Sequence, residues 1–194
     1  MKFRLLLVGA LLVASMSSAY AAGPYVAAAG GLSIFHDSDV SAGYTRTISY
    51  NIGAGFGVSA GYNFDGPRIE FEFGYRNNNI NEVNSFSVSG TDLTVLSYMI
   101  NGIYDFKTNS PFSPFIGVGL GMVNGTIDVQ PTGDNTADTE FGYQAIFGVS
   151  YAVNKNLNLD LSYRFQGAAS DFKFQEVKVS YMSSNIFAGM RYNF

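Results

Sequence analysis

A strict alternation of bulky apolar and small polar residues runs from Tyr50 to Phe64, and it restricts the possible folds more than any other feature of the chain. Every second residue is apolar or aromatic, and the residues between them are Gly, Ser and Asn. Successive side chains of a β-strand point to opposite faces, so this period of two predicts a long strand with one apolar and one polar face. A helix over the same residues would have no apolar stripe.

The same period recurs along the rest of the chain. Alternating stretches cover residues 26–34, 68–76, 96–106, 116–122, 140–151, 157–165 and 185–194, which makes eight predicted strands in one domain. Three connections are short, around 65–66, 107–113 and 154–156, and four are long and polar, over 36–47, 77–92, 128–138 and 167–176. Asp-Gly and Asn-rich pairs suit hairpin turns because they tolerate positive φ. An even number of strands places both ends of the domain at the rim of the short turns.

The N-terminal segment has the order of a secretory signal peptide. Lys2 and Arg4 precede an apolar run over residues 5–14, and an Ala-x-Ala site ends at Ala21. We expect cleavage after Ala21, which leaves residues 22–194 as the mature domain. A membrane-spanning helix needs about 20 apolar residues, and no segment of the chain offers that length. If residues 22–194 cross a membrane, they must do so as a closed barrel.

The apolar face of the predicted barrel could turn outward to lipid or inward, as in a soluble lipocalin-like barrel. The polar face is mostly Gly, Ser and Asn, whereas a soluble surface is roughly a quarter or more charged. The apolar face is also too bulky for the narrow interior of eight strands. Aromatic residues near the strand ends suit the girdles of a membrane interface: Tyr62, Phe64, Tyr104, Phe106 and Tyr192. The sequence therefore predicts an all-β, eight-stranded antiparallel up-and-down transmembrane β-barrel in a bacterial outer membrane. We expect its long loops to be extracellular and both termini periplasmic.

The charged residues of the predicted strands lie on the polar face. An Arg turned to lipid at the membrane midplane would cost roughly 2–4 kcal/mol, whereas inside the barrel it can pair with a carboxylate. We therefore predict a charge network in the lumen, made of Arg68, Glu70, Glu72, Arg76, Glu140, Asp160, Arg164 and Arg191. Four arginines face four carboxylates in this set, so the lumen is expected to be filled and nearly neutral.

Several short motifs resemble one family of surface proteins. Residues 114–121 (PFIGVGLG), 161–165 (LSYRF) and the ending 189–194 (GMRYNF) are similar to segments of the opacity-protein and surface-antigen barrels. This group is similar to the membrane domain of outer membrane protein A. The resemblance implies a surface barrel that includes adhesins among its relatives, and it implies that the terminal Phe194 is a signal for the barrel-assembly machinery.

The residue types that carry chemistry are scarce. The chain has no Cys, which excludes disulfides and thiolate metal sites, and its single His excludes a two-histidine metal site. His36 lies in a run with Asp37, Ser38 and Asp39, but a catalytic triad is recognised by geometry and usually draws its members from separate segments. We expect no catalytic residues, no metal and no cofactor. A net charge of −4 also argues against nucleic acid as a partner.

The function expected from these features is structural or adhesive. The barrel would sit among outer-membrane lipid, and its loops would contact lipopolysaccharide, host or envelope components. Two alternatives stay open. The Gly-rich, charged lumen could form a narrow porin for ions or small solutes, and His36 could serve a lipid A-modifying enzyme.

Overall fold

The computed structural model describes residues 22–36, 38–41, 45–83, 86–87, 91–129, 134–174 and 177–194. The predicted signal peptide, residues 1–21, lies outside these residues, so the peptide and its cleavage site stay predictions. Across the described ranges, no helix has the length and apolar character needed to cross a membrane.

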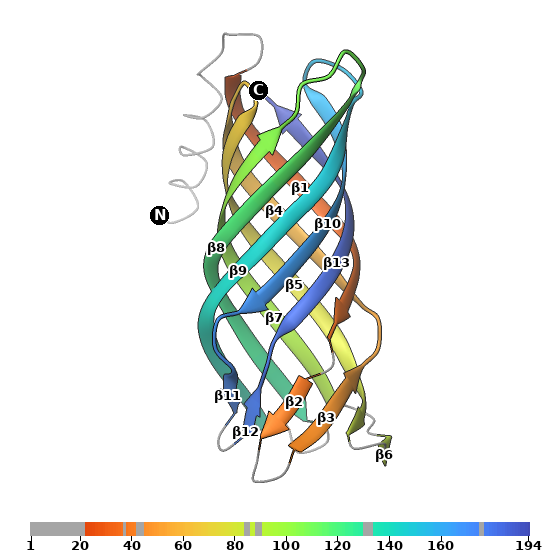
Figure 1. The fold of residues 1–194 in the computed structure, drawn as a ribbon, viewed down its shortest axis with the longest axis vertical. Helices are drawn as coiled ribbons and strands as arrows, with labels where there is room; N and C mark the ends of the chain where they lie inside the picture. The colour runs from red at the N-terminus through yellow and green to blue at the C-terminus, as the bar shows by residue number, and fades with distance from the viewer. Residues whose placement is uncertain are drawn as a thin grey trace, which may run out of the picture.

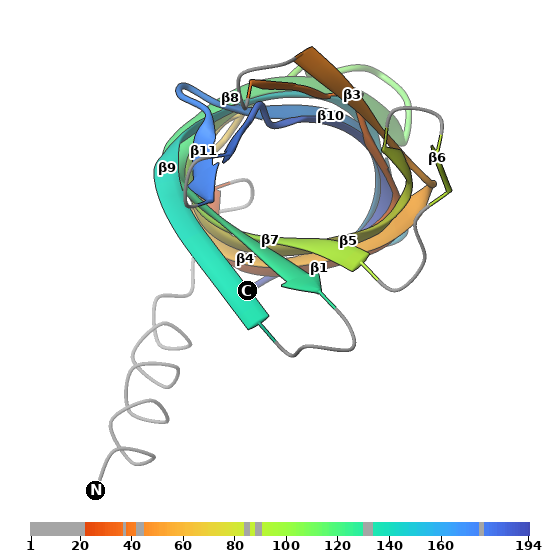
Figure 2. The ribbon, with the colours of Figure 1, turned by 90° about the horizontal axis from the view of Figure 1, so that it is seen from below.

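Eight long strands form a closed barrel (Figures 1 and 2). They are β1 (Ala22–Phe35), β4 (Gly53–Phe64), β5 (Pro67–Val83), β7 (Thr91–Asp105), β8 (Phe112–Val129), β9 (Asp134–Ala152), β10 (Leu157–Ala168) and β13 (Met182–Asn193). Each strand pairs antiparallel with the next along this series. The last strand then pairs with the first, from Tyr25 opposite Asn193 to Phe35 opposite Ser183, and this pairing closes the ring. The predicted fold class is confirmed.

Five short strands extend the sheet at one end of the barrel, which we call the loop end. They are β2 (Ser38–Ser41), β3 (Thr45–Tyr50), β6 (Phe86–Ser87), β11 (Phe172–Phe174) and β12 (Val177–Val179). The pairing order β11-β12-β2-β3-β5 joins the fourth loop to the first, and β6 pairs with β5 (Figure 1).

The predicted lengths of the loops were wrong. Segments expected to be long polar loops are largely strand, since β5 continues to Val83 and β8 continues to Val129. The strand expected to begin at Tyr50 begins at Gly53, and Tyr50 instead ends β3. Ladder hydrogen bonds join backbone groups, so a hairpin can extend beyond the membrane after its apolar alternation has stopped.

The opposite end, which we call the turn end, has the three short connections that the sequence predicted. In the first, Asp65 and Gly66 have φ of 65° and 132°, and the Asn63 side chain accepts hydrogen bonds from both of their backbone N–H groups. Positive φ is what Asp-Gly pairs tolerate. The N–H of the terminal Phe194 donates to the Pro24 carbonyl at 3.1 Å, so the two ends of residues 22–194 meet here.

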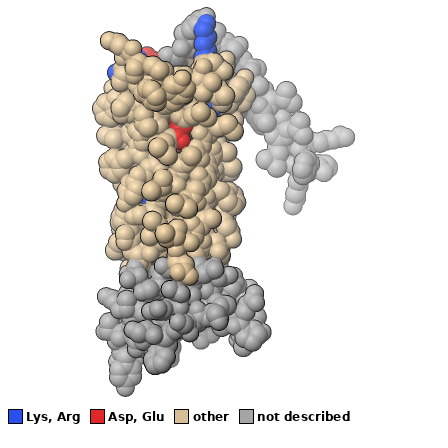
Figure 3. Space-filling model, turned by 90° about the vertical axis from the view of Figure 1, so that its right-hand side faces the viewer, with Lys and Arg blue, Asp and Glu red and all other residues tan. Residues whose placement is uncertain are grey.

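The bulky apolar residues point outward, as predicted. Phe71, Ile100 and Val118 are 53%, 63% and 68% exposed, which is the opposite of a soluble barrel core. Figure 3 shows one side of the wall, where few charged atoms are visible among the residues drawn in colour, and most of these lie toward the turn end. Such a surface is suited to lipid.

The aromatic residues predicted to form a girdle lie on this outward face near the turn end. Their rings contact one another in pairs, with centroid distances of 4.8 to 5.2 Å for Tyr62–Phe64, Tyr104–Phe106 and Tyr192–Phe194. Their role at the membrane interface stays a prediction.

Candidate functional site

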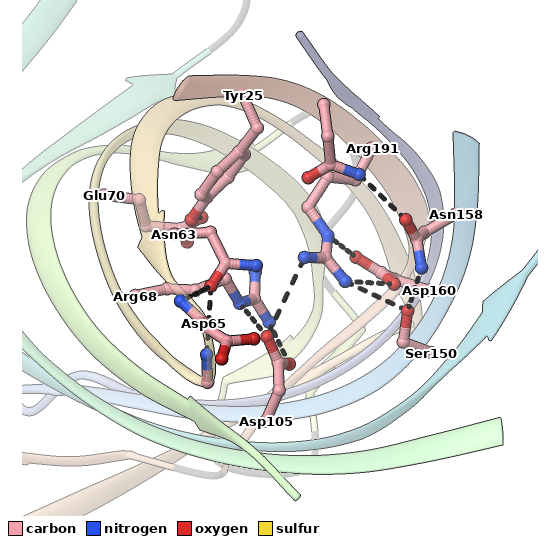
Figure 4. A network of polar contacts seen from close by, with 12 residues as sticks. Tyr25, Asn63, Asp65, Arg68, Glu70, Asp105, Ser150, Asn158, Asp160 and Arg191 are labelled. Atoms are coloured by element: carbon pink, nitrogen blue, oxygen red, sulfur yellow. Dashed lines mark hydrogen bonds and ion pairs between the residues drawn. The ribbon is translucent and has the colours of Figure 1, made fainter. Parts of the chain in front are cut away.

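A first layer of ion pairs crosses the lumen near the turn end (Figure 4). The Arg68 guanidinium contacts the Asp105 carboxylate through Nε–Oδ2 at 2.7 Å and Nη2–Oδ1 at 2.9 Å. Arg191 pairs with Asp160 at 3.1 Å and donates to the Ser150 hydroxyl at 3.0 Å. Nη1 of Arg191 also lies 3.8 Å from Asp105, which comes from the opposite side of the ring. This layer therefore ties β5, β7, β10 and β13 together through their side chains.

A second layer lies deeper in the lumen. Glu72 of β5 forms an ion pair with Arg164 of β10, and these two strands stand opposite each other in the ring, four positions apart either way. The Asn101 amide donates to both Glu70 and Glu72, at 3.0 and 3.1 Å. The Tyr25 hydroxyl donates to Glu70 at 2.7 Å. Each carboxylate thus has donors that compensate for its burial, as a buried charge requires.

The structure forms only some of the ion pairs that the predicted charge network allows. Within that network it pairs Glu72 with Arg164, and Asp160 with Arg191. The partner of Arg68 is Asp105, a residue that the sequence places on the polar face but that was not assigned to the network.

Three members of the predicted network, Glu70, Arg76 and Glu140, have no ion-pair partner among the described residues. Glu70 accepts hydrogen bonds from the neutral Tyr25, Ser59 and Asn101 instead. Arg76 is fully buried and donates to the neutral Asn185 and Ser97, at 3.2 and 3.0 Å, while its guanidinium lies 5.7 Å from the centre of the Phe187 ring. Glu140, opposite Val123 on the inner face, is partly buried. The ion pairs expected for these three residues are therefore absent from the described part of the structure.

A third closure lies at the loop end and is apolar. Strand β11 lies at the loop-end mouth of the barrel (Figure 2). Phe172 of β11 and Val179 of β12 are both almost completely buried. They pack in one cluster with Phe35, Leu93, Val95, Val123 and Tyr181. The prediction of a polar loop over residues 167–176 was wrong at Phe172, and this plug was not predicted.

Glycine makes room for the plug. A Cβ on Gly125 would lie 2.9 to 3.1 Å from three atoms of the Phe172 ring, closer than ordinary packing allows. The apolar residues of 172–179 alternate with Lys173 and Lys178 and were the available signal for a buried hairpin.

The space left inside the barrel is small. Between the charge layers lies a cavity of about 30 Å³ whose lining includes Glu72, Arg164 and Phe115, and it holds at most one or two water molecules. A wider hollow of about 710 Å³ lies at the turn end, outside the Arg68–Asp105 pair, and is lined by Asp65, Lys107 and Asn193 among others. The described side chains therefore close the lumen between its two ends.

The single histidine lies on the outer wall, at the loop end of β1. Its Nε2 is 2.9 Å from the Ser184 hydroxyl of β13, and the Tyr163 hydroxyl of β10 is 2.8 Å from the same Ser184 oxygen. The His36 and Phe165 rings meet at a centroid distance of 6.1 Å. Sequence reasoning had considered His36 only with its neighbours. Of these, Asp37 lies outside the described residues, as do the side chains of Ser38 and Asp39.

The whole chain matches one family model. The model of the outer membrane protein beta-barrel domain covers residues 3–193. The chain belongs to this family. This match confirms the predicted place of the barrel in a bacterial outer membrane.

Individual relatives confirm the predicted resemblance to opacity and surface-antigen barrels. Major surface antigen 4 of Anaplasma marginale is 30% identical over 71% of this chain, and the match spans 59% of that protein. Opacity protein opA58 of Neisseria gonorrhoeae is 30% identical over 71% of this chain and 70% of its own length. The crystal structure of neisserial surface protein A superposes with a TM-score of 0.64 at 28% identity, covering 89% of this chain and 99% of that one.

Proposed function

We propose that this protein is a closed outer-membrane barrel whose role is to hold a folded loop surface outside the cell, in contact with lipopolysaccharide, host or envelope components. The observation that carries the proposal is the joint occurrence of a filled lumen and a paired loop end. The lumen is occupied by two charge layers and an apolar plug. The loops, in contrast, are organised into one sheet of β11, β12, β2, β3 and β5.

The filled lumen argues against the alternative of a narrow porin. Conduction would require the Glu72–Arg164 pair and the buried Phe172 to move out of the path together. Breaking a buried ion pair costs several kcal/mol, typically about 3–5 kcal/mol, and exposing a buried Phe adds to that cost. The positions of the described side chains therefore do not support a lumen that is permanently open.

Charge is distributed in a way that supports recognition by the loops. The segments 36–50, 77–92, 128–138 and 167–178 contain nine acidic and three basic residues. The rest of residues 22–194 contains six of each. All of the negative excess of the mature chain thus lies in the loop segments. The proposed partner of this surface presents positive charge, and contact with lipopolysaccharide phosphates would pass through bridging divalent cations.

The proposal includes an orientation. The loop end faces the cell exterior, and the turn end, with Ala22 and Phe194, faces the periplasm. Names of relatives such as surface antigen and opacity protein support an exposed loop end. In this orientation Phe194 would be presented to the barrel-assembly machinery from the periplasmic side.

The orientation can be tested with a matched pair of lysines. The chain has no Cys, so Lys173→Cys at the loop end and Lys155→Cys at the turn end each introduce a single thiol on an exposed position. A membrane-impermeant maleimide should label Lys173→Cys in intact cells and Lys155→Cys only after the outer membrane is permeabilised. Labelling of Lys155→Cys, but not of Lys173→Cys, in intact cells would contradict the proposed orientation.

The contact role is tested by replacing the three acidic residues of segment 128–138, Asp128, Asp134 and Asp138, with Asn, which removes three of the six excess negative charges of the loop segments. We expect cells with the neutralised barrel to lose salt-sensitive attachment to a polylysine-coated surface relative to cells with the intact barrel, and neither strain should gain attachment to heparin. An unheated gel must show that the neutralised barrel is folded. Unchanged attachment by a folded, neutralised barrel would contradict a role for the acidic loop surface.

A further inference from the structure

One strand at the loop end has a long edge with no neighbouring strand. Among the described strands, β9 pairs with β8 from Asp134 to Tyr151 but with β10 only from Gly142 to Ala152. The second edge of the stretch Asp134–Phe141 therefore has no strand paired to it, and we call it the open edge. It is the longest one-sided stretch of the described sheet. An open strand edge presents backbone donors and acceptors to which another chain can pair.

The backbone groups of the open edge belong to alternate residues. Ala169 donates its N–H to the Phe141 carbonyl at 2.8 Å, so the backbone groups of Phe141 point away from β8. In an antiparallel ladder the N–H and C=O of one residue point to the same side of the strand, and those of the next residue point to the other side. Thr139, Ala137 and Asn135 therefore turn their N–H and C=O groups toward the open edge.

A carboxylate takes part of the place that a further strand would occupy. Strand β11 lies beside β9 at the open edge, but no backbone ladder joins the two strands among the described residues (Figure 2). Instead, the Asp138 carboxylate accepts the backbone N–H of Thr139 at 2.9 Å and that of Lys173 at 2.6 Å. Inside a sheet such N–H groups pair with the carbonyl oxygens of a neighbouring strand. The side chain of Asp138 thus acts as a substitute for the carbonyl groups of a strand that is not there.

The open edge is also acidic. The charged residues of β9 are Asp134, Asp138 and Glu140, and the strand has no Lys or Arg. Asp138 and Glu140 share one face of the strand, since Glu140 lies opposite the buried Val123 and Asp138 is two residues away. Pairing with the same edge of a second copy would bring the carboxylates of two β9 strands together, and like charges on neighbouring strands are destabilising. A strand with Lys or Arg at these positions would be stabilised instead.

We propose that the open edge of β9 is a docking site for an extended, basic polypeptide segment of a partner protein, which adds to the sheet as one further strand antiparallel to β9. This inference rests on the proposed function, because it names the kind of partner that the acidic loop surface binds. Backbone hydrogen bonds to alternate residues of β9 hold the segment, and its basic side chains lie opposite Asp138 and Glu140. A carbonyl of the added strand accepts the N–H of Thr139, which frees the Asp138 carboxylate to pair with a basic side chain.

Peptides that differ only in one backbone edge test the proposal. The probe is a short peptide of alternating Lys and Thr with blocked termini. When its Lys residues lie opposite Asp138 and Glu140, its Thr residues lie opposite Ala137 and Thr139, and the N–H groups of these peptide Thr residues point to β9. N-methylation of the Thr residues removes those donors. N-methylation of an equal number of Lys residues blocks only the other edge and keeps the charge, so it is the matched control. Fluorescence anisotropy measures the binding of each labelled peptide to the folded barrel in nanodiscs of neutral lipid.

We expect the unmodified and the Lys-methylated peptides to bind equally well. The Thr-methylated peptide should bind about tenfold more weakly or worse, the effect of losing two or more net hydrogen bonds. NMR hydrogen exchange should show that the bound peptide slows exchange of the Ala137 amide by about tenfold or more. The amide of Thr136, which points to β8, should be unchanged. Ala137→Pro removes the N–H at the open edge without removing a ladder bond to β8, and should weaken binding of the unmodified peptide.

Three results would overturn the inference. Equal binding of the two methylated peptides would mean that charge alone holds the peptide, and absence of binding by the unmodified peptide would mean that the edge is not a docking site. Slow exchange of the Ala137 amide in concentrated barrel without peptide would mean that a second copy occupies the edge. Attachment to polylysine is a separate readout of the proposed contact role. If attachment still depends on Asp128, Asp134 and Asp138, strand addition alone has failed.

Discussion

The Asp105 carboxylate serves two arginines that reach it from different sides of the barrel. Arg68, on the neighbouring strand, contacts it at 2.7 and 2.9 Å, and Arg191, from the opposite strand, lies 3.8 Å away. The Arg68 side chain is only 3% exposed and that of Asp105 14%. Asp105 at the end of β7 is thus the anion that pairs with Arg68 and a second, more distant anion for Arg191, whose closer partner is Asp160.

Asp105→Asn should destabilise the barrel strongly. The substitution keeps the shape of the side chain but leaves Arg68 buried without its anion, a change that costs about 3–5 kcal/mol in buried ion pairs. Urea unfolding of the barrel in lipid vesicles measures the loss. Asp65→Asn is the control, because its pair with Lys107 is 48% and 65% exposed and such pairs contribute only about 0–1 kcal/mol. Equal effects of the two substitutions would show that the Arg68–Asp105 pair is not a determinant of stability.

Phe172→Ala should release the β11–β12 hairpin without unfolding the barrel. Its ring is fully buried in the plug, and truncation of a buried Phe costs about 3–5 kcal/mol. The free energy of a local opening depends on the contacts of the segment that opens. We therefore expect faster hydrogen exchange in residues 172–179 and unchanged exchange in β4 and β5. Lys173→Ala, on the exposed face of the same strand, should leave the exchange rates unchanged. Faster exchange throughout the barrel would mean that the hairpin is part of the global folding unit.

Gly125→Ala should act on the same hairpin through a steric clash. The added Cβ would meet the Phe172 ring at 2.9 Å, and overpacking of this kind costs about 1–3 kcal/mol. Gly102→Ala is the matched control, because a Cβ there has no neighbour within 4 Å, and it should change stability by less than about 0.5 kcal/mol. In a double-mutant cycle the cost of Gly125→Ala should largely vanish on a Phe172→Ala background. If the stability losses of Gly125→Ala and Phe172→Ala simply add in the double variant, the Cβ at position 125 does not clash with the Phe172 ring.

Deletion of the aromatic ring in Phe194→Ala should slow assembly in cells more than refolding in vitro. The ring is 46% exposed on the outer wall and packs on Tyr192 at 5.2 Å, so its loss removes little buried contact. The expected result is less folded protein in the outer membrane but a normal yield from detergent refolding. Tyr192→Ala removes the neighbouring ring and serves as the control for lost packing. Equal assembly defects in both variants would speak for packing rather than for a terminal signal.

The barrel itself was predictable because its main determinant is local. The alternation of apolar and polar residues around Phe71 and Val118 directly predicts which face of each strand points outward. The pair Asp65-Gly66 likewise predicts a turn from two residues alone. Contacts across the lumen are different, because they depend on the stagger of strands that are distant in sequence. Asp160 with Arg191 and Arg68 with Asp105 both join adjacent strands, but Asp105 was left out of the predicted network. The link from His36 to Ser184 spans 148 residues and follows only from closure of β1 on β13.

The plug was missed for a further reason. Polar residues around Phe172 and Val179 predict an exposed loop when each residue is taken with its sequence neighbours. Burial of these two side chains depends on the open mouth of the barrel beneath them, which exists only after the ring has closed. A hydrophobic site provided by the assembled barrel cannot be recognised from the local pattern.

Single-channel conductance of the refolded chain in a planar bilayer tests the closed lumen most directly. We expect the intact barrel to be silent. A barrel without residues 170–178 should also be silent because both charge layers remain, and openings should appear only when the charged residues of both layers are replaced by Ala as well. An unheated gel must first show that each protein is folded. Reproducible openings of the intact barrel that change on charge reversal at Glu72 or Arg164 would contradict the closed lumen and identify the protein as a small porin.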